Sequence, residues 1–121
     1  MLLLSLVTAA HCAAAEGSSE ADPVRVLVWD ERQPEQKQAY GDKFLGQAIA
    51  EALEKEGFAV RSTGLDEAAQ GLAAALLDWA EVLIWWGHVR HSKITPETGK
   101  KIVERIKQGR LSLIALHSAH W

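Results

Sequence analysis

Four of the five histidines in this 121-residue chain form two pairs with the same spacing. The pairs are His88–His91 and His117–His120. Each pair directly follows a short apolar run, 82–86 before the first and 111–116 before the second. If these runs are neighbouring parallel strands, the imidazoles meet at the carboxyl edge of one sheet, where open α/β folds bind ligands. The spacing therefore predicts one site that contains all four imidazoles.

Imidazoles gathered in this way suit two kinds of chemistry. Three neutral imidazoles, or two with a carboxylate, hold Zn²⁺ and leave one position for water. Such a metal lowers the pKa of its water to about 7 and polarises a carbonyl. We therefore predict a divalent metal, with zinc as the first candidate, bound by the four paired histidines. Two alternatives stay open: the histidines act without metal as acids, bases or sugar ligands, or they hydrogen-bond loop backbone.

Two carboxyl groups and a hydroxyl stand at equivalent positions. Asp30 and Glu31 follow the apolar run 24–29, and Ser118 lies inside the second histidine pair. The carboxyl groups suit a base, a metal ligand or an acceptor for sugar hydroxyls, with a solvated loop as the alternative. Ser118 lacks the flanking glycines of a nucleophile elbow, so it is expected to donate a hydrogen bond or cap a helix. The predicted catalytic residues are Glu31, His88 and His117. The predicted substrate-binding residues are Asp30, Trp86 and Ser118.

Five tryptophans are present, and four lie near the expected strand ends: Trp29, Trp85, Trp86 and Trp121. Aromatic faces suit the apolar faces of sugars, although packing in the core is the more frequent use of the side chain. Neighbouring residues of a strand face opposite sides of the sheet, so Trp85 and Trp86 must separate. We expect Trp86 to contact a ligand and Trp79 to lie in the core.

The elements that must position these residues follow from apolar periodicity. Four β-branched or apolar runs predict strands at 24–29, 58–62, 82–86 and 111–116. Spacings of three and four predict helices at 40–53 and 72–78, and one that begins at Pro96 after the N-cap Thr95. Alternating strands and helices with nearly continuous apolar strands indicate a parallel sheet covered on both faces. Right-handed crossovers then predict a three-layer, doubly wound, flavodoxin-like α/β fold with strand order 2-1-3-4. The chain stops soon after the last strand, so we expect the fold to be truncated at its C-terminus.

The N-terminal segment differs from the rest of the chain. Residues 1–10 are almost wholly apolar, and residues 1–15 contain no Asp, Glu, Lys or Arg and end in three alanines, which is typical of a secretory signal peptide. Residues 16–23 read as a flexible leader and 24–121 as the α/β domain. The protein is therefore expected to be secreted or periplasmic, with a buried N-terminal helix as the alternative for 1–15. Cys12, the single cysteine, lies in this segment, so a mature chain would have no thiol for disulfides or catalysis.

Charge and apolar length exclude two classes of partner. The formal net charge is −3, and no cluster of lysines and arginines could neutralise several phosphates, so nucleic acid is not expected. The longest apolar stretch, 1–15, is too short to cross a bilayer, so no membrane span is expected. The sequence does not decide whether the chain forms a homo-oligomer, so that alternative stays open.

Longer motifs give a resemblance to a known family. They are V-L-V-W-D-E at 26–31, G-L-D at 64–66, V-L-I-W-W-G-H-V-R-H at 82–91 and L-I-A-L-H-S-A-H-W at 113–121. From 26 to 121 the chain resembles the ThuA-like (trehalose-utilisation) family. The resemblance implies a fold similar to class I glutamine amidotransferases and a small-molecule carbohydrate partner, notably disaccharides and their 3-keto derivatives. It predicts hydrolysis or cleavage of 3-keto glycosides, with a non-catalytic sugar- or metal-binding module as the alternative. Domains of that family are longer, so the chain would correspond to their N-terminal part.

Overall fold

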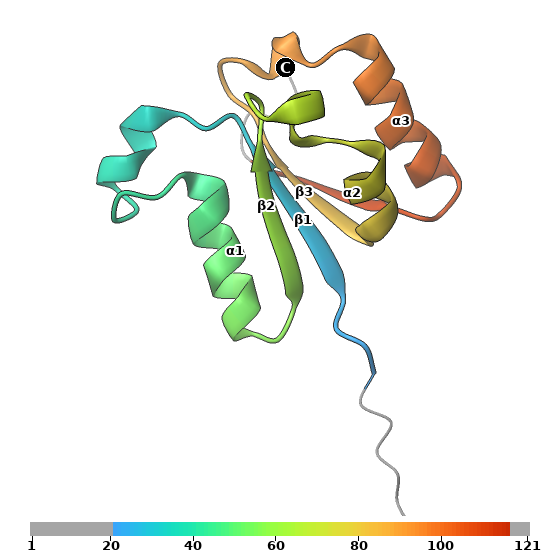
Figure 1. Cartoon of the computed structure of the whole chain (residues 1–121), viewed down its shortest axis with the longest axis horizontal. Helices are drawn as coiled ribbons and strands as arrows, with labels where there is room; N and C mark the ends of the chain where they lie inside the picture. The colour runs from blue at the N-terminus through green and yellow to red at the C-terminus, as the bar shows by residue number, and fades with distance from the viewer. Residues whose placement is uncertain (1–20, 117–121) are drawn as a thin grey trace, which may run out of the picture.

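The computed structural model describes residues 21–116. Four strands in this range form one parallel sheet. Its strands are β1 (Arg25–Asp30), β2 (Ala59–Gly64), β3 (Val82–Trp86) and β4 (Ser112–Leu116). The strand order is β2-β1-β3-β4, with β1 and β3 in the centre (Figure 1). This confirms the predicted doubly wound, flavodoxin-like α/β fold.

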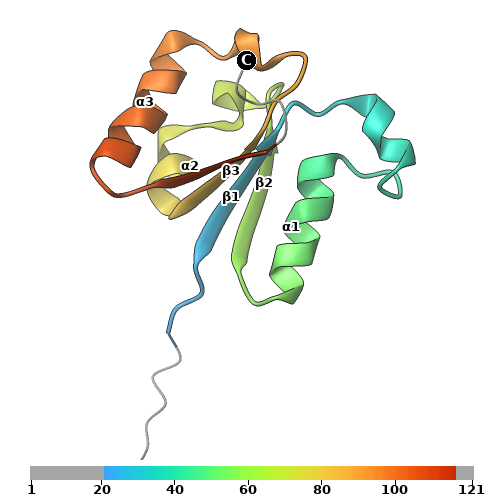
Figure 2. The ribbon, with the colours of Figure 1, turned by 180° about the vertical axis from the view of Figure 1, so that it is seen from behind.

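Helices cover both faces of the sheet. The α-helices are α1 (Leu45–Lys55), α2 (Ala74–Trp79) and α3 (Pro96–Lys107). Three short 3₁₀ helices lie in the connections: η1 (Pro34–Gln38), η2 (Ala68–Gly71) and η3 (His91–Lys93). The α1 helix packs on one face, and α2 and α3 lie on the other, as the views from the front and from behind both show (Figures 1 and 2). The three layers are therefore helix, sheet and helix.

The core is divided by the sheet into two clusters. Leu27 and Trp29 of β1 pack with Leu77 of α2 and Ile102 of α3. The alternate residues of the strand, including Val28, pack against α1 on the other face. Because successive side chains of a strand point to opposite faces, a central strand needs apolar residues throughout. This explains why the run was continuous in the sequence.

The first helix begins later than its apolar spacing predicted. The predicted start at Tyr40 is wrong: α1 begins at Leu45, and Tyr40 is exposed. Gly41 and Asp42 both adopt φ of +63°, which is left-handed backbone and cannot continue a right-handed helix. The polar stretch before them forms η1, which periodicity did not predict.

The second helix also begins later, at Ala74 rather than at residue 72. Ala69, Gln70 and Gly71 all have positive φ, so the chain turns tightly before the helix. At Gly71 a Cβ would lie 2.6 Å from the carbonyl oxygen of Gly64, so only glycine fits. Leu72 still enters the core, as its apolar character predicted, but from the turn rather than from the helix.

Several predictions lie outside the described residues. They concern the signal peptide at 1–15, most of the leader at 16–23, and His117, Ser118, His120 and Trp121. Between residues 21 and 116, none of the helices has the length and apolar character needed to cross a bilayer.

Candidate functional site

The candidate site lies where the chain connections diverge at the carboxyl edge of the sheet. The chain leaves β1 towards β2 and leaves β3 towards β4, in opposite directions. Open α/β sheets bind ligands in the crevice at such a switch point. A cavity of about 360 Å³ is present there, which we call the switch-point crevice. It is lined by residues of the loops after β1 and β3: Arg32, Gln33, Pro34, Glu35, Val89 and Arg90.

The loop after β3 is built around the carboxylate of Glu31, which is fully buried. The backbone N–H groups of His88 and Arg90 donate to its Oε1 at 2.9 and 2.7 Å. The N–H of Val89 and the side-chain amide of Gln33 donate to its Oε2 at 3.0 and 2.9 Å. Both oxygens are therefore occupied by donors from the protein.

The first histidine pair lies in this same loop. His88 is exposed, and its ring centroid lies 6.2 Å from that of Trp86. His91 begins η3, and its Nδ1 lies 3.6 Å from Oε1 of Glu31. A Cβ on Gly87 would lie only 2.7 Å from Cβ of His91, so the loop closes tightly. The structure thus places the imidazole of His91 beside Glu31, whereas His88 meets Glu31 through its backbone N–H only. The predicted gathering of all four imidazoles stays a prediction.

The two adjacent carboxyl groups after β1 have opposite pKa shifts. Burial raises the pKa of Glu31, but the N–H groups of Val89, His88 and Arg90 together outweigh it, so the net pKa is lowered. Burial also raises the pKa of Asp30, and there it prevails over the N–H of Gly46 and the charge of Arg32.

Asp30 is directed towards α1 rather than towards the crevice. Its Oδ2 accepts the N–H of Gly46 at 3.0 Å, at the start of α1. Its Oδ1 lies 3.1 Å from Nη1 of Arg32. The side chain is fully buried, so its contacts stabilise the helix end. Its predicted role in substrate binding stays a prediction.

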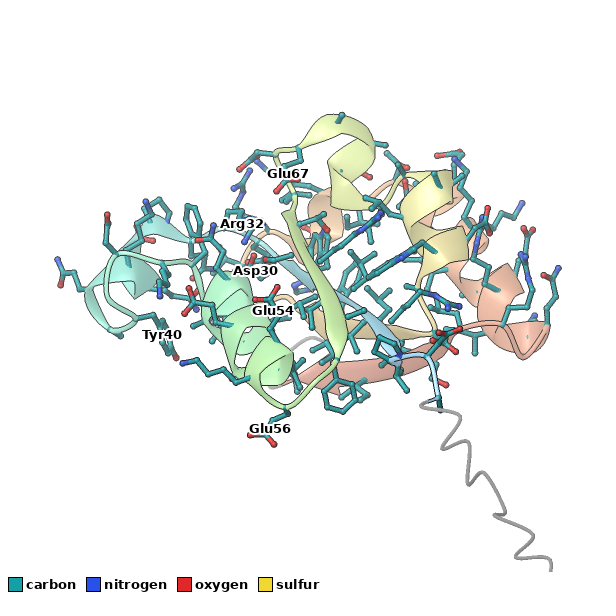
Figure 3. The ribbon with its side chains drawn as sticks, turned by 60° about the horizontal axis from the view of Figure 1, so that its bottom comes forward. Asp30, Arg32, Tyr40, Glu54, Glu56 and Glu67 are labelled. Carbon is teal, nitrogen blue, oxygen red and sulfur yellow. The ribbon has the colours of Figure 1, made fainter. Side chains whose placement is uncertain are left out.

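Paired charges surround the crevice, and the sequence analysis did not identify them. Arg32 bridges Asp30 and Glu67, with 3.1 Å between its Nη2 and Oε1 of Glu67 (Figure 3). Arg90 donates to both carboxylate oxygens of Asp66, at 2.9 and 2.5 Å. Asp66 and Glu67 follow β2, so three strand ends contribute to the site. Of these charged residues, Asp30, Asp66 and Arg90 stood in the quoted motifs, and no spacing rule connects them to their partners.

The tryptophans are divided between the core and the edges of the cavities. Trp29 is fully buried, and Trp85 stacks on it with 4.0 Å between ring centroids. Trp86 follows on the opposite face of β3 and is 7% exposed. Trp79 is partly buried against the core, as expected. Contact of Trp86 with a ligand stays a prediction.

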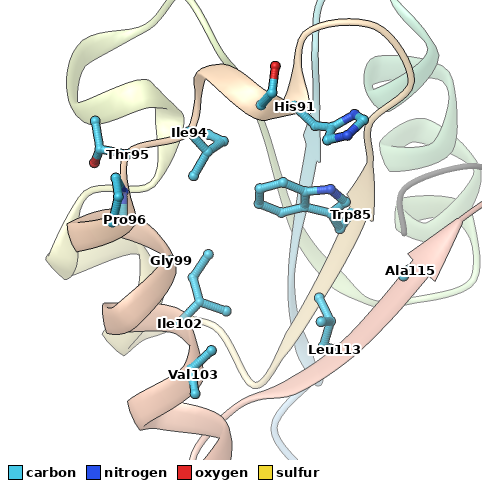
Figure 4. Close-up of a pocket in the computed structure, with 11 residues that line it drawn as sticks. Trp85, His91, Ile94, Thr95, Pro96, Gly99, Ile102, Val103, Leu113 and Ala115 are labelled. Carbon is cyan, nitrogen blue, oxygen red and sulfur yellow. The ribbon is translucent and has the colours of Figure 1, made fainter. Parts of the chain in front are cut away.

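A second cavity, of about 460 Å³, lies between α3 and the end of the sheet formed by β3 and β4. We call it the α3 groove (Figure 4). Its lining is mainly apolar: Trp85, His91, Ser92, Ile94, Thr95, Pro96, Gly99, Ile102, Val103, Leu113 and Ala115. His91 thus lines the groove, whereas Val89 and Arg90, which precede it in the same loop, line the crevice.

The described residues do not by themselves supply the predicted metal site. Between residues 21 and 116 no three His, Cys, Asp or Glu side chains are grouped so that they could hold a metal ion. Of the four predicted ligands, His88 and His91 are described, and His117 and His120 are not.

A scan of the chain against protein-family models finds no match, and a search of curated proteins finds none either.

Proposed function

We propose that the protein binds a small carbohydrate in the switch-point crevice and cleaves 3-keto glycosides, by hydrolysis or elimination, in the manner of the ThuA-like family that it resembles. The observation that carries this proposal is a polar crevice at the switch point, bordered by the loop with His88 and His91. Sugar hydroxyls both donate and accept hydrogen bonds. Arginine and glutamine side chains beside a carboxyl group offer partners for both.

A 3-keto group makes the neighbouring C–H bond acidic. A base that removes this proton, and an acid that protonates the glycosidic oxygen, together release the leaving group. Imidazole is the most frequent side chain in both roles. The candidates for these roles are His88 and His91 of the described loop, with His117 as the predicted third.

The divalent metal, with zinc as first candidate, stays a prediction that requires His117 or His120. The proton transfers proposed for the imidazoles do not depend on it. The predicted signal peptide would make the protein secreted or periplasmic, so the substrate would be a glycoside outside the cytoplasm.

A non-catalytic sugar-binding module is the second candidate, and one observation favours it. Both carboxyl groups at the end of β1, Asp30 and Glu31, are fully buried and engaged with the protein. Glycoside cleavage commonly uses a pair of accessible carboxyl groups, and these two do not qualify. A binding module needs only the polar lining of the crevice.

The experiment compares a 3-keto disaccharide with its unoxidised parent. We expect release of monosaccharide from the keto form, and His88→Ala should lower kcat/KM by about 100-fold or more. Lys100→Ala, an exposed change on α3, is the control and should leave turnover unchanged. Calorimetric binding of the disaccharide without turnover would favour the binding module. The absence of both binding and turnover would contradict both candidates.

A further inference from the structure

The loop that carries the first histidine pair is held by a residue from another part of the chain. Glu31 follows β1, yet its carboxylate accepts the N–H groups of three consecutive residues after β3, at 88, 89 and 90. Its side chain is 0% exposed. A group with no exposed surface cannot touch a ligand in the crevice, so its effect on a ligand must pass through the loop.

We propose that Glu31 is a positioning residue: its buried carboxylate fixes loop 87–91 and thereby sets the places of Arg90, which lines the switch-point crevice, and of His88 and His91 in the same loop. The fixing of the loop rests on the hydrogen bonds to Glu31 alone. Its consequence for a sugar rests on the proposed function. The predicted role of Glu31 as a catalytic group is replaced by this one.

The backbone of the loop requires an acceptor of this kind. Residues 87–90 belong to no helix or strand, so their N–H groups have no ladder partners. Buried N–H groups need hydrogen-bond partners, and an ionised carboxylate only accepts, at two oxygens. Three backbone donors and the amide of Gln33 converge on Glu31. A neutral amide in its place would turn an NH₂ group towards some of these donors.

The same contacts reach the functional side chains. Oε1 of Glu31 lies 3.6 Å from Nδ1 of His91, whose side chain is 18% exposed. The guanidinium of Arg90 donates to the backbone oxygen of Glu31 at 3.4 Å. At the start of the loop, a Cβ on Gly87 would lie 3.4 Å from Oε1 of Glu31 and 2.7 Å from Cβ of His91. The loop is therefore packed around the carboxylate from its first residue to its last.

The experiment measures hydrogen exchange of the amides of residues 88–90 in the full chain. In the wild type we expect all three to exchange at least tenfold more slowly than an unstructured peptide. Glu31→Gln should speed their exchange by roughly 10- to 100-fold, because donors lose a charged acceptor. Glu54→Gln changes an exposed carboxyl group on α1 that lines neither cavity, and it should leave the three amides as they were.

A second readout separates positioning from catalysis. If Glu31 positions the loop, Glu31→Gln raises KM for the 3-keto disaccharide together with the loss of amide protection. If Glu31 acted on the substrate, kcat would fall while the amides stayed protected, and the proposal would be overturned. Unprotected amides in the wild type would overturn it as well.

Gly87→Ala provides an independent variant that retains the buried carboxylate, for the case in which Glu31→Gln unfolds the chain. It keeps the charge of Glu31 and places a methyl group 2.7 Å from Cβ of His91 and 3.4 Å from Oε1 of Glu31, so the loop must shift and the same amides should exchange faster. Unchanged protection in Gly87→Ala would overturn the proposal. Amide protection that depends on Glu31 in a protein without sugar binding or turnover would support positioning and overturn the proposed function, so the two failures are distinguishable.

Discussion

The two cavities differ in the types of residue that line them. The α3 groove is the larger, about 460 Å³, and is lined mainly by apolar side chains of α3, β3 and β4. The switch-point crevice is about 360 Å³ and is lined largely by charged and polar side chains from two loops. The groove resembles the core beside it, whereas the crevice is made of groups that must be paired to be stable.

The difference shows why the smaller cavity is the better candidate for function. Apolar walls need only to be covered, and many sequences satisfy that requirement. A crevice bordered by Arg32 and Arg90, each with carboxylate partners, and by a loop folded on Glu31 needs particular residues from three strand ends. Such specific polar construction costs desolvation and is typical of sites rather than of packing.

The largest effect should come from the ring at the base of the groove. Trp85→Ala removes a side chain stacked at 4.0 Å on Trp29, and we expect a loss of about 3 kcal/mol in the free energy of unfolding. Urea denaturation measures it. Val103→Ala, at an exposed position of the same groove, should change stability by less than about 0.5 kcal/mol. Equal losses in the two variants would mean that the groove is not continuous with the core.

Substitution of Gly87, in the loop beside the crevice, should lower stability even when only a methyl group is added. In Gly87→Ala the new methyl would lie 2.7 Å from Cβ of His91 and 3.1 Å from Nε1 of Trp85. We expect a loss of about 2 kcal/mol, since a closely packed loop must shift. Thermal unfolding followed by circular dichroism gives the change. Unchanged thermal stability would show that the loop after β3 can accommodate the methyl group without loss of packing.

Substitution of Gly99, which lines the groove, should change the free energy of unfolding in the opposite direction. Gly99 lies within the 12-residue helix α3, and a Cβ there would meet nothing within 4 Å. Gly99→Ala should therefore raise the free energy of unfolding by up to about 1 kcal/mol, because alanine favours the helix more than glycine does. The same unfolding measurement tests it. Destabilisation at Gly99 would remove the contrast between the two cavities.

The smallest effect concerns acid unfolding, and it separates the two carboxyl groups after β1. The folded state lowers the pKa of Glu31, so its contribution to stability is complete above the ordinary value of 4.5 and is lost as pH falls through the lowered pKa. The folded state raises the pKa of Asp30, so falling pH adds stability as that group takes up its proton. Glu31→Gln should flatten the decline of stability in acid.

The matched variant Asp30→Asn should make that decline steeper, because it removes the opposing contribution. Urea midpoints measured at a series of pH values between neutral and acid give both slopes. If the two variants changed the slope in the same direction, the donors around Glu31 would not outweigh its burial.

The sequence by itself determined the sheet. Continuous apolar runs, their alternation with helical spacing and the right-handed rule predicted the parallel order, and the strands formed close to their expected bounds. The prediction from apolar spacing was wrong at the start of α1, where the left-handed backbone at Gly41 and Asp42 cannot continue a helix. Periodicity reports which face a residue occupies, but it does not report the dihedral angles of a turn.

Only the tertiary structure decided the character of the candidate site. The motifs placed His88, His91 and Glu31 at neighbouring strand ends, and Glu31 there accepts the backbone N–H of His88 and lies 3.6 Å from Nδ1 of His91. That Glu31 lies beneath the loop, and that Arg32 pairs with Glu67, follows from contacts between segments far apart in the chain. A charged side chain carries no local signal of its partner, because pairing depends on which loops the crossovers bring to the switch point.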